Sequence, residues 1–496
     1  MSFKKSMWPK NPKIYEVNTW PWLNSLSETY NTPISLKNIP DEIFNQEIKF
    51  FDAVWLMGVW ERSPAGRRIA LERQDLQNEY HKALHDFGET DVVGSPYSVY
   101  YYHVDANLGG VEGLEKVRKQ FQERGIRLIL DYVPNHVAID HLWILEKSDM
   151  FITGTLEDLM ANPNGFFSIG EKVYANGRDP YFDPWTDTVQ INAFSIEARK
   201  KAINTILNIA ELCDGIRCDM AMLMTNDVFK KTWGKKAGDQ PKKEFWREVI
   251  PAVKEKFSNF LFIAEVYWDM EWVLMQQGFD YCYDKKLYDR LVNETPTTVM
   301  EHLKAESEYQ SKLLRFIENH DEPRAIEKFG EERSKAAAII IMTLPGACLI
   351  HEGQTHGYKI KLPIQLDRRP FEEDNKRLLE FYQNLLNIAP NIRFEKENWS
   401  LCKAEPVIVD DPSYQNIISY LWWNNDIYQL TVVNYSPYHV KAHLRLNQIN
   451  FKSKNWSFID LLHQRTYNYK GEDLDEFGLY IDLTPWNGHI FKIKRV

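Results

Sequence analysis

The sequence predicts an α/β fold: a (β/α)8 TIM barrel with an irregular insertion after the third strand and a C-terminal antiparallel β domain. Three observations predict it. Short apolar runs alternate eight times with stretches of helical periodicity, the alternation is interrupted over residues 137–194, and it stops near residue 396. Eight strand–helix units in succession are typical of a closed parallel barrel.

The expected barrel strands are short apolar runs rich in β-branched and aromatic residues. They cover residues 13–18, 53–57, 126–131, 215–219, 260–266, 279–283, 313–318 and 347–351. Helical periodicity between them is clearest over residues 110–124, 195–211 and 333–344. We expect Ser195 to cap the second of these helices, because its hydroxyl can accept a hydrogen bond from a free backbone N–H.

The two interruptions predict the domain organisation. Residues 137–194 are rich in Asn, Gly, Pro and aromatic residues and contain no long periodic helix, which indicates an irregular subdomain. Residues 417–435 read as two strands joined by an Asn-Asn-Asp turn, and further short strands follow. We therefore predict a barrel over residues 1–136 and 195–395, an inserted subdomain over 137–194, and a β-sandwich over 396–496.

Composition restricts the partners and the compartment. The formal net charge of −10 argues against nucleic acid or an anionic membrane, because both require a basic surface. The N-terminus has no apolar run that would predict a signal peptide, and no stretch approaches the roughly 18 apolar residues of a membrane span. Five cysteines without a CxxC pair predict no disulfide framework, so we expect a cytoplasmic protein. The oligomeric state stays open.

Charged residues occur where the expected strands end, which is the end of a barrel that carries active sites. These residues are Asp131, His136, Arg217, Asp219, Glu265, His320 and Asp321. Placing charges beside apolar strands costs free energy unless they pair or take part in chemistry. One interpretation is a set of buried ion pairs that close the barrel; the other is an active site.

The spacing of two acids favours the active site. Arg217 and Asp219 are two residues apart on one strand, so their side chains point to the same side. We expect the guanidinium to lower the pKa of Asp219 and keep it ionised, as a covalent nucleophile requires. Glu265 lies among apolar strand residues, which we expect to raise its pKa so that it can carry a proton. Glycoside hydrolysis uses such a pair, and Asp321 is expected to be a third acid.

Four motifs carry a resemblance to glycoside hydrolase family 13, the α-amylase family. They are DYVPNH at 131–136, GIRCD at 215–219, IAEV at 263–266 and ENHD at 318–321, and they resemble the family's four conserved regions in order. The resemblance spans roughly residues 13 to 356. It implies a retaining double displacement in which Asp219 attacks the anomeric carbon and Glu265 is the acid/base. It further implies that Asp321, His136, His320 and Arg217 hold the sugar and that Tyr97 stacks on it.

The sequence departs from the family after the nucleophile. Starch-degrading members usually carry a Lys-His pair there, whereas this chain has Met220, Met222 and Met224 in an apolar run. These methionines could exclude water from the acceptor side, or they could pack in the core. Asn135 resembles a calcium-binding position of many members, but the missing histidine removes another contributor. We expect no cofactor and no catalytic metal, and leave a structural calcium ion open.

The leading functional hypothesis is hydrolysis of α-glucosidic bonds in oligosaccharides or related α-glucosides, with carbohydrate as the partner. An α-glucosyl transferase, isomerase or phosphorylase of the same family is the alternative. A non-catalytic sugar-binding or scaffold protein would be expected to lack the acids, yet Asp219, Glu265 and Asp321 are all present. The sequence does not specify the sugar, the linkage or the preferred chain length.

Overall fold

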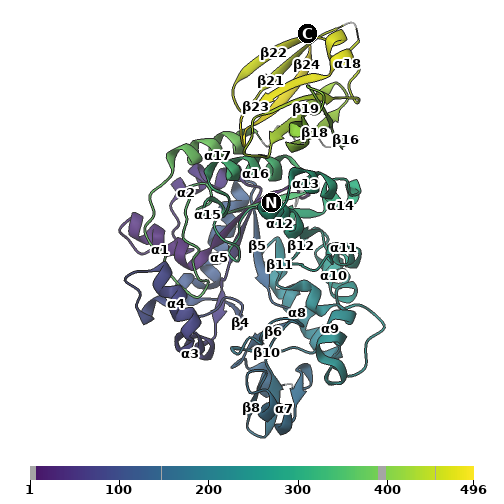
Figure 1. Cartoon of the computed structure of the whole chain (residues 1–496). Coiled ribbons are helices and arrows are strands. Elements are labelled where there is room, and N and C mark those ends of the chain that lie inside the picture. The colour runs from purple at the N-terminus through teal and green to yellow at the C-terminus, as the bar shows by residue number, and fades with distance from the viewer. Residues whose placement is uncertain (1–6, 147, 389–397, 453) are drawn as a thin grey trace. The chain divides into compact units, whose positions relative to one another are not determined.

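Eight parallel strands form a closed barrel, as the sequence predicts. The structure is a computed structural model that describes residues 7–146, 148–388, 398–452 and 454–496 (Figure 1). The barrel strands are β1 (Lys13–Asn18), β2 (Ala53–Met57), β5 (Arg127–Tyr132), β11 (Gly215–Cys218), β12 (Leu261–Ala264), β13 (Tyr281–Tyr283), β14 (Leu313–Arg315) and β15 (Ala347–His351). Barrel order follows chain order, which is the arrangement that successive strand–helix units produce.

Three strands end earlier than expected, and the first of them, β11, ends at Cys218 rather than at residue 219. Strand β12 ends at Ala264 rather than at residue 266, and β14 ends at Arg315 rather than at residue 318. Glu265 follows β12 directly, and Glu318 lies three residues after the end of β14. The expected strands therefore ran into the loops that carry polar side chains.

The barrel strands are buried almost without interruption. Every residue of β1, β2, β11, β12 and β15 is buried, as expected where helices cover the outside and side chains fill the inside. The interior is not purely apolar, because Arg217 is about 1% exposed and Glu16 is fully buried. A buried guanidinium of this kind requires carboxylate partners.

The predicted helices are confirmed. Helices α5 (Gly110–Glu123), α8 (Ile196–Leu212) and α16 (Glu331–Thr343) match the three periodic segments to within two residues. The Ser195 hydroxyl caps α8 by accepting the Ala198 N–H at 3.3 Å. Other helices include α1 (Thr19–Thr29), α3 (Pro64–Glu72), α4 (Gln74–Ala83), α9 (Asn226–Trp233), α10 (Phe245–Lys256), α11 (Glu271–Gln277), α12 (Lys285–Asn293), α13 (Pro296–His302) and α17 (Lys376–Ile388).

The insertion after the third barrel strand is irregular and contains two small antiparallel sheets. Strand β6 (His136–Ala138) pairs with β10 (Thr188–Gln190), and β9 (Lys172–Ala175) pairs with both β7 (Thr153–Gly154) and β8 (Phe166–Ile169). These strands lie beyond the ends of β5 and β11 (Figure 1). Its own apolar core includes Val137, Phe151, Tyr174, Val189 and Ile191.

The C-terminal region forms two antiparallel sheets. One has the order β16 (Asn398–Leu401), β18 (Ile417–Asn424), β19 (Ile427–Asn434), β24 (Gly488–Arg495), β21 (Asn455–Asp460), β22 (Arg465–Lys470). The other has the order β17 (Lys403–Pro406), β20 (Val440–Arg445), β23 (Leu479–Leu483). The predicted hairpin is present, with Asn425 at φ 53° in its turn. Apolar residues of both sheets form one core.

By internal contacts the chain divides into two compact units. One contains residues 13–283 and 360–371; the other contains residues 10–12, 284–359 and 372–496. In the second unit α16 packs on the C-terminal sheet, where Trp422 donates a hydrogen bond to the Thr343 carbonyl at 2.8 Å. The predicted boundary at 395/396 lies outside the described residues, so the predicted domain limits stay a prediction. Among the described residues, no helix is both long and apolar enough to cross a membrane.

Candidate active site

One guanidinium joins the two predicted catalytic acids. Arg217 Nη1 lies 2.7 Å from Asp219 Oδ1, and Arg217 Nη2 lies 2.7 Å from Glu265 Oε2. A third carboxylate, Asp131 Oδ1, is 3.6 Å from Nη1. All four side chains are at most 8% exposed. The structure therefore brings Arg217, Asp219 and Glu265 together in one buried charged cluster.

Strand register explains how these residues meet. In the β11–β12 pair, Cys218 lies opposite Ala264, so Asp219 and Glu265 follow directly at two adjacent strand ends. In the β11–β5 pair, Arg217 lies opposite Asp131. The carboxyl ends of parallel strands lie at the same edge, and side chains two residues apart share a face.

The surroundings of Glu265 are polar, contrary to the prediction of an apolar setting. Its Oε2 accepts the backbone N–H of Met220 at 2.7 Å, and its Oε1 accepts the hydroxyl of Tyr267 at 2.8 Å. Its Oε2 also lies 2.7 Å from the Arg217 guanidinium. The predicted apolar setting is therefore wrong, because the apolar residues beside Glu265 in sequence are not the contacts of its side chain. That Glu265 carries a proton stays a prediction.

Backbone strain occurs just after both acids. Met220 (φ 41°), Trp268 (φ 63°) and Asp269 (φ 57°) all adopt left-handed conformations that residues other than glycine rarely take. Such conformations cost of order 1–3 kcal/mol each and cluster at functional sites. At Met220 the unusual conformation accompanies a specific contact, since its N–H donates to Glu265.

Aromatic rings surround the cation. The Arg217 guanidinium carbon lies 5.0 Å from the ring centre of Tyr97, 5.3 Å from that of Trp55 and 5.8 Å from that of Tyr283. Burial alone would lower the pKa of Arg217, but the charge of Glu265 leads the interactions that raise it well above its ordinary value. The guanidinium is therefore a permanent positive charge.

Tyr97 and His136 are also brought together. The His136 ring is hydrogen-bonded to the Tyr97 backbone, and its centre lies 5.0 Å from that of Trp185. Burial lowers the pKa of His136 to about 4, only partly offset by the Tyr97 hydrogen bond. His136 is thus neutral near pH 7 and suited to hydrogen bonding.

Asp321 and His320 belong to the second compact unit, in the loop that follows β14. His320 Nε2 lies 3.0 Å from Asp321 Oδ2, and the Asp321 side chain is 41% exposed. The Asn319 Oδ1 accepts the backbone N–H of Asp321 at 2.9 Å and fixes the loop. Their predicted roles at the sugar stay predictions.

Comparison with known proteins identifies the family. Residues 95–377, more than half of the chain, match the family model described as alpha amylase, catalytic domain. The chain belongs to the alpha-amylase family. The matched segment contains Asp219, Glu265 and Asp321.

Curated relatives and solved structures named as alpha-amylases agree with membership of this family. Alpha-amylase MalA of Haloarcula japonica is 23% identical over 362 residues, covering 71% of this chain and 45% of that protein. Alpha-amylase 3 of Dictyoglomus thermophilum is 24% identical over 308 residues, covering 57% and 58%. The chain thus spans about half the length of these curated relatives. The maltogenic alpha-amylase AmyB from Thermotoga neapolitana shares the fold, with a TM-score of 0.68, 18% identity and coverage of 97% and 98%.

The methionines that follow Asp219 in the chain are mostly core residues. Met222 and Met224 are both fully buried, on the short 3₁₀ helix Ala221–Met224. Only Met220 is partly exposed. The hypothesis that all three form an apolar acceptor surface is wrong, because residues on a helical turn face different directions.

Asn135, at the position that resembles a calcium-binding position of the family, forms hydrogen bonds with the side-chain amide of Gln190. Gln190 Nε2 donates to both the Asn135 side-chain oxygen and its carbonyl at 2.9 Å, and Asn135 Nδ2 donates to Gln190 Oε1 at 3.2 Å. Calcium sites require several oxygen ligands, usually with carboxylates. The amide pair supplies no carboxylate; a structural calcium ion stays open, and the absence of a cofactor stays a prediction.

Sequence reasoning did not single out Tyr267. It follows Glu265 by two residues, and strand-like alternation could have suggested that both side chains point to one side. An exposed aromatic pair comes next: the ring centres of Trp268 and Tyr181 are 4.9 Å apart, and the residues are 36% and 58% exposed. Such exposed rings can stack on sugars.

Tyr267→Phe should lower kcat/KM on an α-glucoside by about tenfold or more, because a hydrogen bond to a charged group contributes about 1.5–3 kcal/mol. The lost bond is the one that Glu265 Oε1 accepts at 2.8 Å. Initial rates over a pH series would measure the effect. Tyr174→Phe, which removes a hydroxyl from the insertion core, is the control and should leave kcat/KM unchanged. An equal loss in both variants would contradict a role of Tyr267 at Glu265.

Proposed function

We propose that the chain is a retaining glycosidase that cleaves α-glucosidic bonds of oligosaccharides or related α-glucosides. The observation that carries the proposal is the guanidinium of Arg217, which contacts Asp219 and Glu265 at adjacent strand ends. Retention requires two carboxyl groups close enough to act on one bond, about 5–5.5 Å apart. A shared arginine keeps them on the same side of the barrel. The alpha-amylase and alpha-glucosidase names of the relatives support this substrate class.

In the first step Asp219 attacks the anomeric carbon as the bond to the glycosidic oxygen breaks, and Glu265 gives that oxygen its proton. In the second step water attacks the same carbon and breaks the ester to Asp219, while Glu265 takes the proton of the water. Two inversions restore the α configuration. Atoms and charge balance without any cofactor.

Charge balance in the cluster supplies a physical reason for this cycle. Asp131, Asp219 and Glu265 share one guanidinium, so the fully ionised cluster has an excess of negative charge. Repulsion between like charges favours a proton on one carboxyl group, which Glu265 needs as an acid. Once Asp219 is esterified, one negative charge is gone and Arg217 favours ionised Glu265, which is then a base.

Other residues bind the sugar in this proposal. Neutral His136 donates or accepts a hydrogen bond, and Tyr97, held over Arg217, offers a ring face. By the family resemblance Asp321 is the third acid and His320 a sugar ligand. A ligand in a solved structure of the same fold supports the class of ligand: the alpha-amylase from Geobacillus thermoleovorans, at 17% identity and a TM-score of 0.66, was solved in complex with acarbose.

Incubation with maltotriose should release reducing ends, since the burial of Met222 and Met224 removes the main reason to expect exclusion of water. Reducing-sugar assay and chromatography of the products measure this, with and without inorganic phosphate. Proton NMR of the first product should detect the α anomer before mutarotation. Longer oligomers without net reducing ends would instead indicate transfer, and dependence on phosphate would indicate phosphorolysis. A β anomer as first product would contradict retention.

A further inference from the structure

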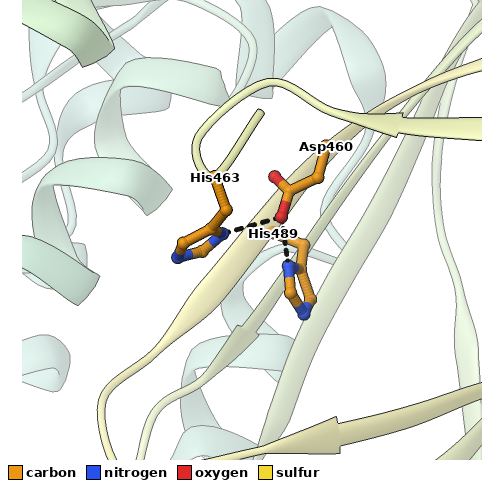
Figure 2. A group of neighbouring side chains, drawn as sticks. All are labelled: Asp460, His463 and His489. Carbon is orange, nitrogen blue, oxygen red and sulfur yellow. Dashed lines mark hydrogen bonds and ion pairs between the residues drawn. The ribbon is translucent and has the colours of Figure 1, made fainter. Parts of the chain in front are cut away.

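A second cluster of chemistry-bearing side chains lies in the larger C-terminal sheet. Asp460 is the last residue of β21, His463 lies in the turn before β22, and His489 is the second residue of β24. Figure 2 shows both imidazoles turned toward the carboxylate of Asp460. One oxygen, Oδ2, lies 2.7 Å from Nδ1 of His463 and 2.7 Å from Nδ1 of His489.

Strand pairing and a backbone hydrogen bond hold these side chains in place. Strands β21 and β24 are paired neighbours, with Asp460 opposite Phe491. The Asp460 Oδ1 accepts the backbone N–H of Leu462 at 3.1 Å, which fixes the start of the turn that carries His463. The His489 ring stacks on Phe491 with 4.9 Å between ring centres. The three donor atoms therefore converge before any ligand binds.

The cluster buries an anionic charge beside imidazoles. Asp460 is fully buried, and its Oδ2 is hydrogen-bonded to both His463 and His489 at 2.7 Å. Within the described part of the chain, no lysine or arginine forms an ion pair with it; both of its ion-pair partners are histidines. A buried carboxylate without a full cationic partner favours the binding of a cation.

We propose that Asp460, His463 and His489 bind a divalent transition-metal ion, with zinc as the best match. Two imidazole nitrogens and one carboxylate oxygen are a ligand set that zinc accepts, whereas calcium and magnesium prefer oxygen alone. The donor atoms all lie within 4.8 Å of one another. The proposal is independent of the catalytic function.

Two of the three ligand separations require little movement, whereas the ligand nitrogens of His463 and His489, which lie within 4.8 Å of each other, would move closer together. Zinc binds such ligands at about 2.0–2.1 Å, which in a tetrahedron separates the ligand atoms by about 3.3 Å. Each of the two contacts of 2.7 Å would lengthen by about half an ångström, within the freedom of side-chain torsions. Because an ionised carboxylate cannot donate, Nδ1 of each ring carries a proton in the ion-free state. On metal binding that proton moves to Nε2 or to solvent.

Three protein ligands leave one tetrahedral position for water. His463 is partly exposed and also lines a cavity of about 450 Å³, together with Lys335, Arg377 and Trp486 of the same compact unit. Water therefore has access to the ring. A bound ion would tie the turn after β21 to β24 and stabilise the C-terminal sheet.

Zinc binding tests the proposal on the full chain after removal of metal with a chelator. Titration with Zn²⁺ alone, followed by calorimetry and by competition with a chromophoric chelator, should give one ion per chain. Zinc should raise the midpoint of thermal unfolding by a few degrees, because ligands that bind only the folded state stabilise it. Co²⁺ should give the visible absorption of a tetrahedral complex.

The variant His463→Ala should weaken zinc affinity by at least about 100-fold and abolish the thermal shift, since losing even an outer-sphere partner costs 10–100-fold. Its ring is 38% exposed, so little packing is lost. His439→Ala is the control: this exposed histidine of the same domain pairs with Asp482 and should bind zinc like the parent. Wild-type affinity in His463→Ala, or no zinc on the parent chain, would overturn the proposal and leave a hydrogen-bonded triad only. If zinc instead bound to the five buried cysteines, His463→Ala would still bind it with the affinity of the parent chain, and the proposal would be wrong.

Discussion

Asparagine in place of Asp219 should lower kcat on an α-glucoside by about 10⁴-fold or more while the chain stays folded. An amide oxygen can still accept the hydrogen bond that Arg217 donates at 2.7 Å, so the cluster keeps its shape. It cannot form a glycosyl ester of comparable stability. Initial rates with maltotriose, together with circular dichroism and thermal unfolding, would measure both effects.

Asp214→Asn, an Asp-to-Asn substitution at the amino end of strand β11, is the matched control. Asp214 precedes β11, pairs with Arg118 at 2.9 Å and accepts the Leu128 N–H at 3.0 Å. Residues at the amino end of barrel strands serve stability rather than chemistry. Asp214→Asn should therefore lower the unfolding midpoint but leave kcat within about twofold. Undiminished activity in Asp219→Asn would remove Asp219 from its assigned role.

The sequence predicted the barrel and its acids because both depend on local pattern. The positions of the strands follow from the apolar runs, and alternation of side chains places Arg217 and Asp219 on one face. Parallel register then brings Glu265 beside them, since Cys218 and Ala264 are paired one residue earlier. These steps require only strand order and the period of the side chains.

The contacts of Glu265 could not be predicted in this way. They depend on the left-handed turn at Met220, which aims its N–H, and on the rotamer that directs the Tyr267 hydroxyl to Oε1. The apolar run 263–266 correctly predicted a strand that ends nearby. It did not predict the polar contacts of the Glu265 carboxyl group. The Asp460, His463 and His489 cluster likewise depends on pairing of β21 with β24, which joins residues distant in sequence.

Among the substitutions considered, replacement of Arg217 should lower the free energy of unfolding the most. Arg217→Met leaves Asp219 and Glu265 buried without their guanidinium partner, and such a loss costs about 3–5 kcal/mol. Activity should fall with it. Arg217→Lys keeps the charge but presents one ammonium group in place of two guanidinium nitrogens, so it should fold better and still lose activity. Urea unfolding and kcat/KM would measure the two effects separately.

The pH dependence distinguishes lost charge pairing from lost packing. Carboxyl groups that have lost their cation destabilise the folded state only while they are ionised, so the deficit of Arg217→Met should be largest near pH 7. It should shrink as the pH falls toward about 4, where protons neutralise ordinary carboxyl groups.

Arg199→Met is the control for a buried arginine outside the acid cluster, since Arg199 pairs with Glu248 at 2.9 Å on helices α8 and α10. It should lose stability but keep kcat/KM, because Glu248 is partly exposed to solvent and does not contact the candidate acids. A deficit in Arg217→Met that stays constant from pH 7 to about 4 would mean that Arg217 contributes mainly by packing. The electrostatic coupling of Asp219 and Glu265 through one guanidinium would then be wrong, and with it the account of how Glu265 alternates between acid and base.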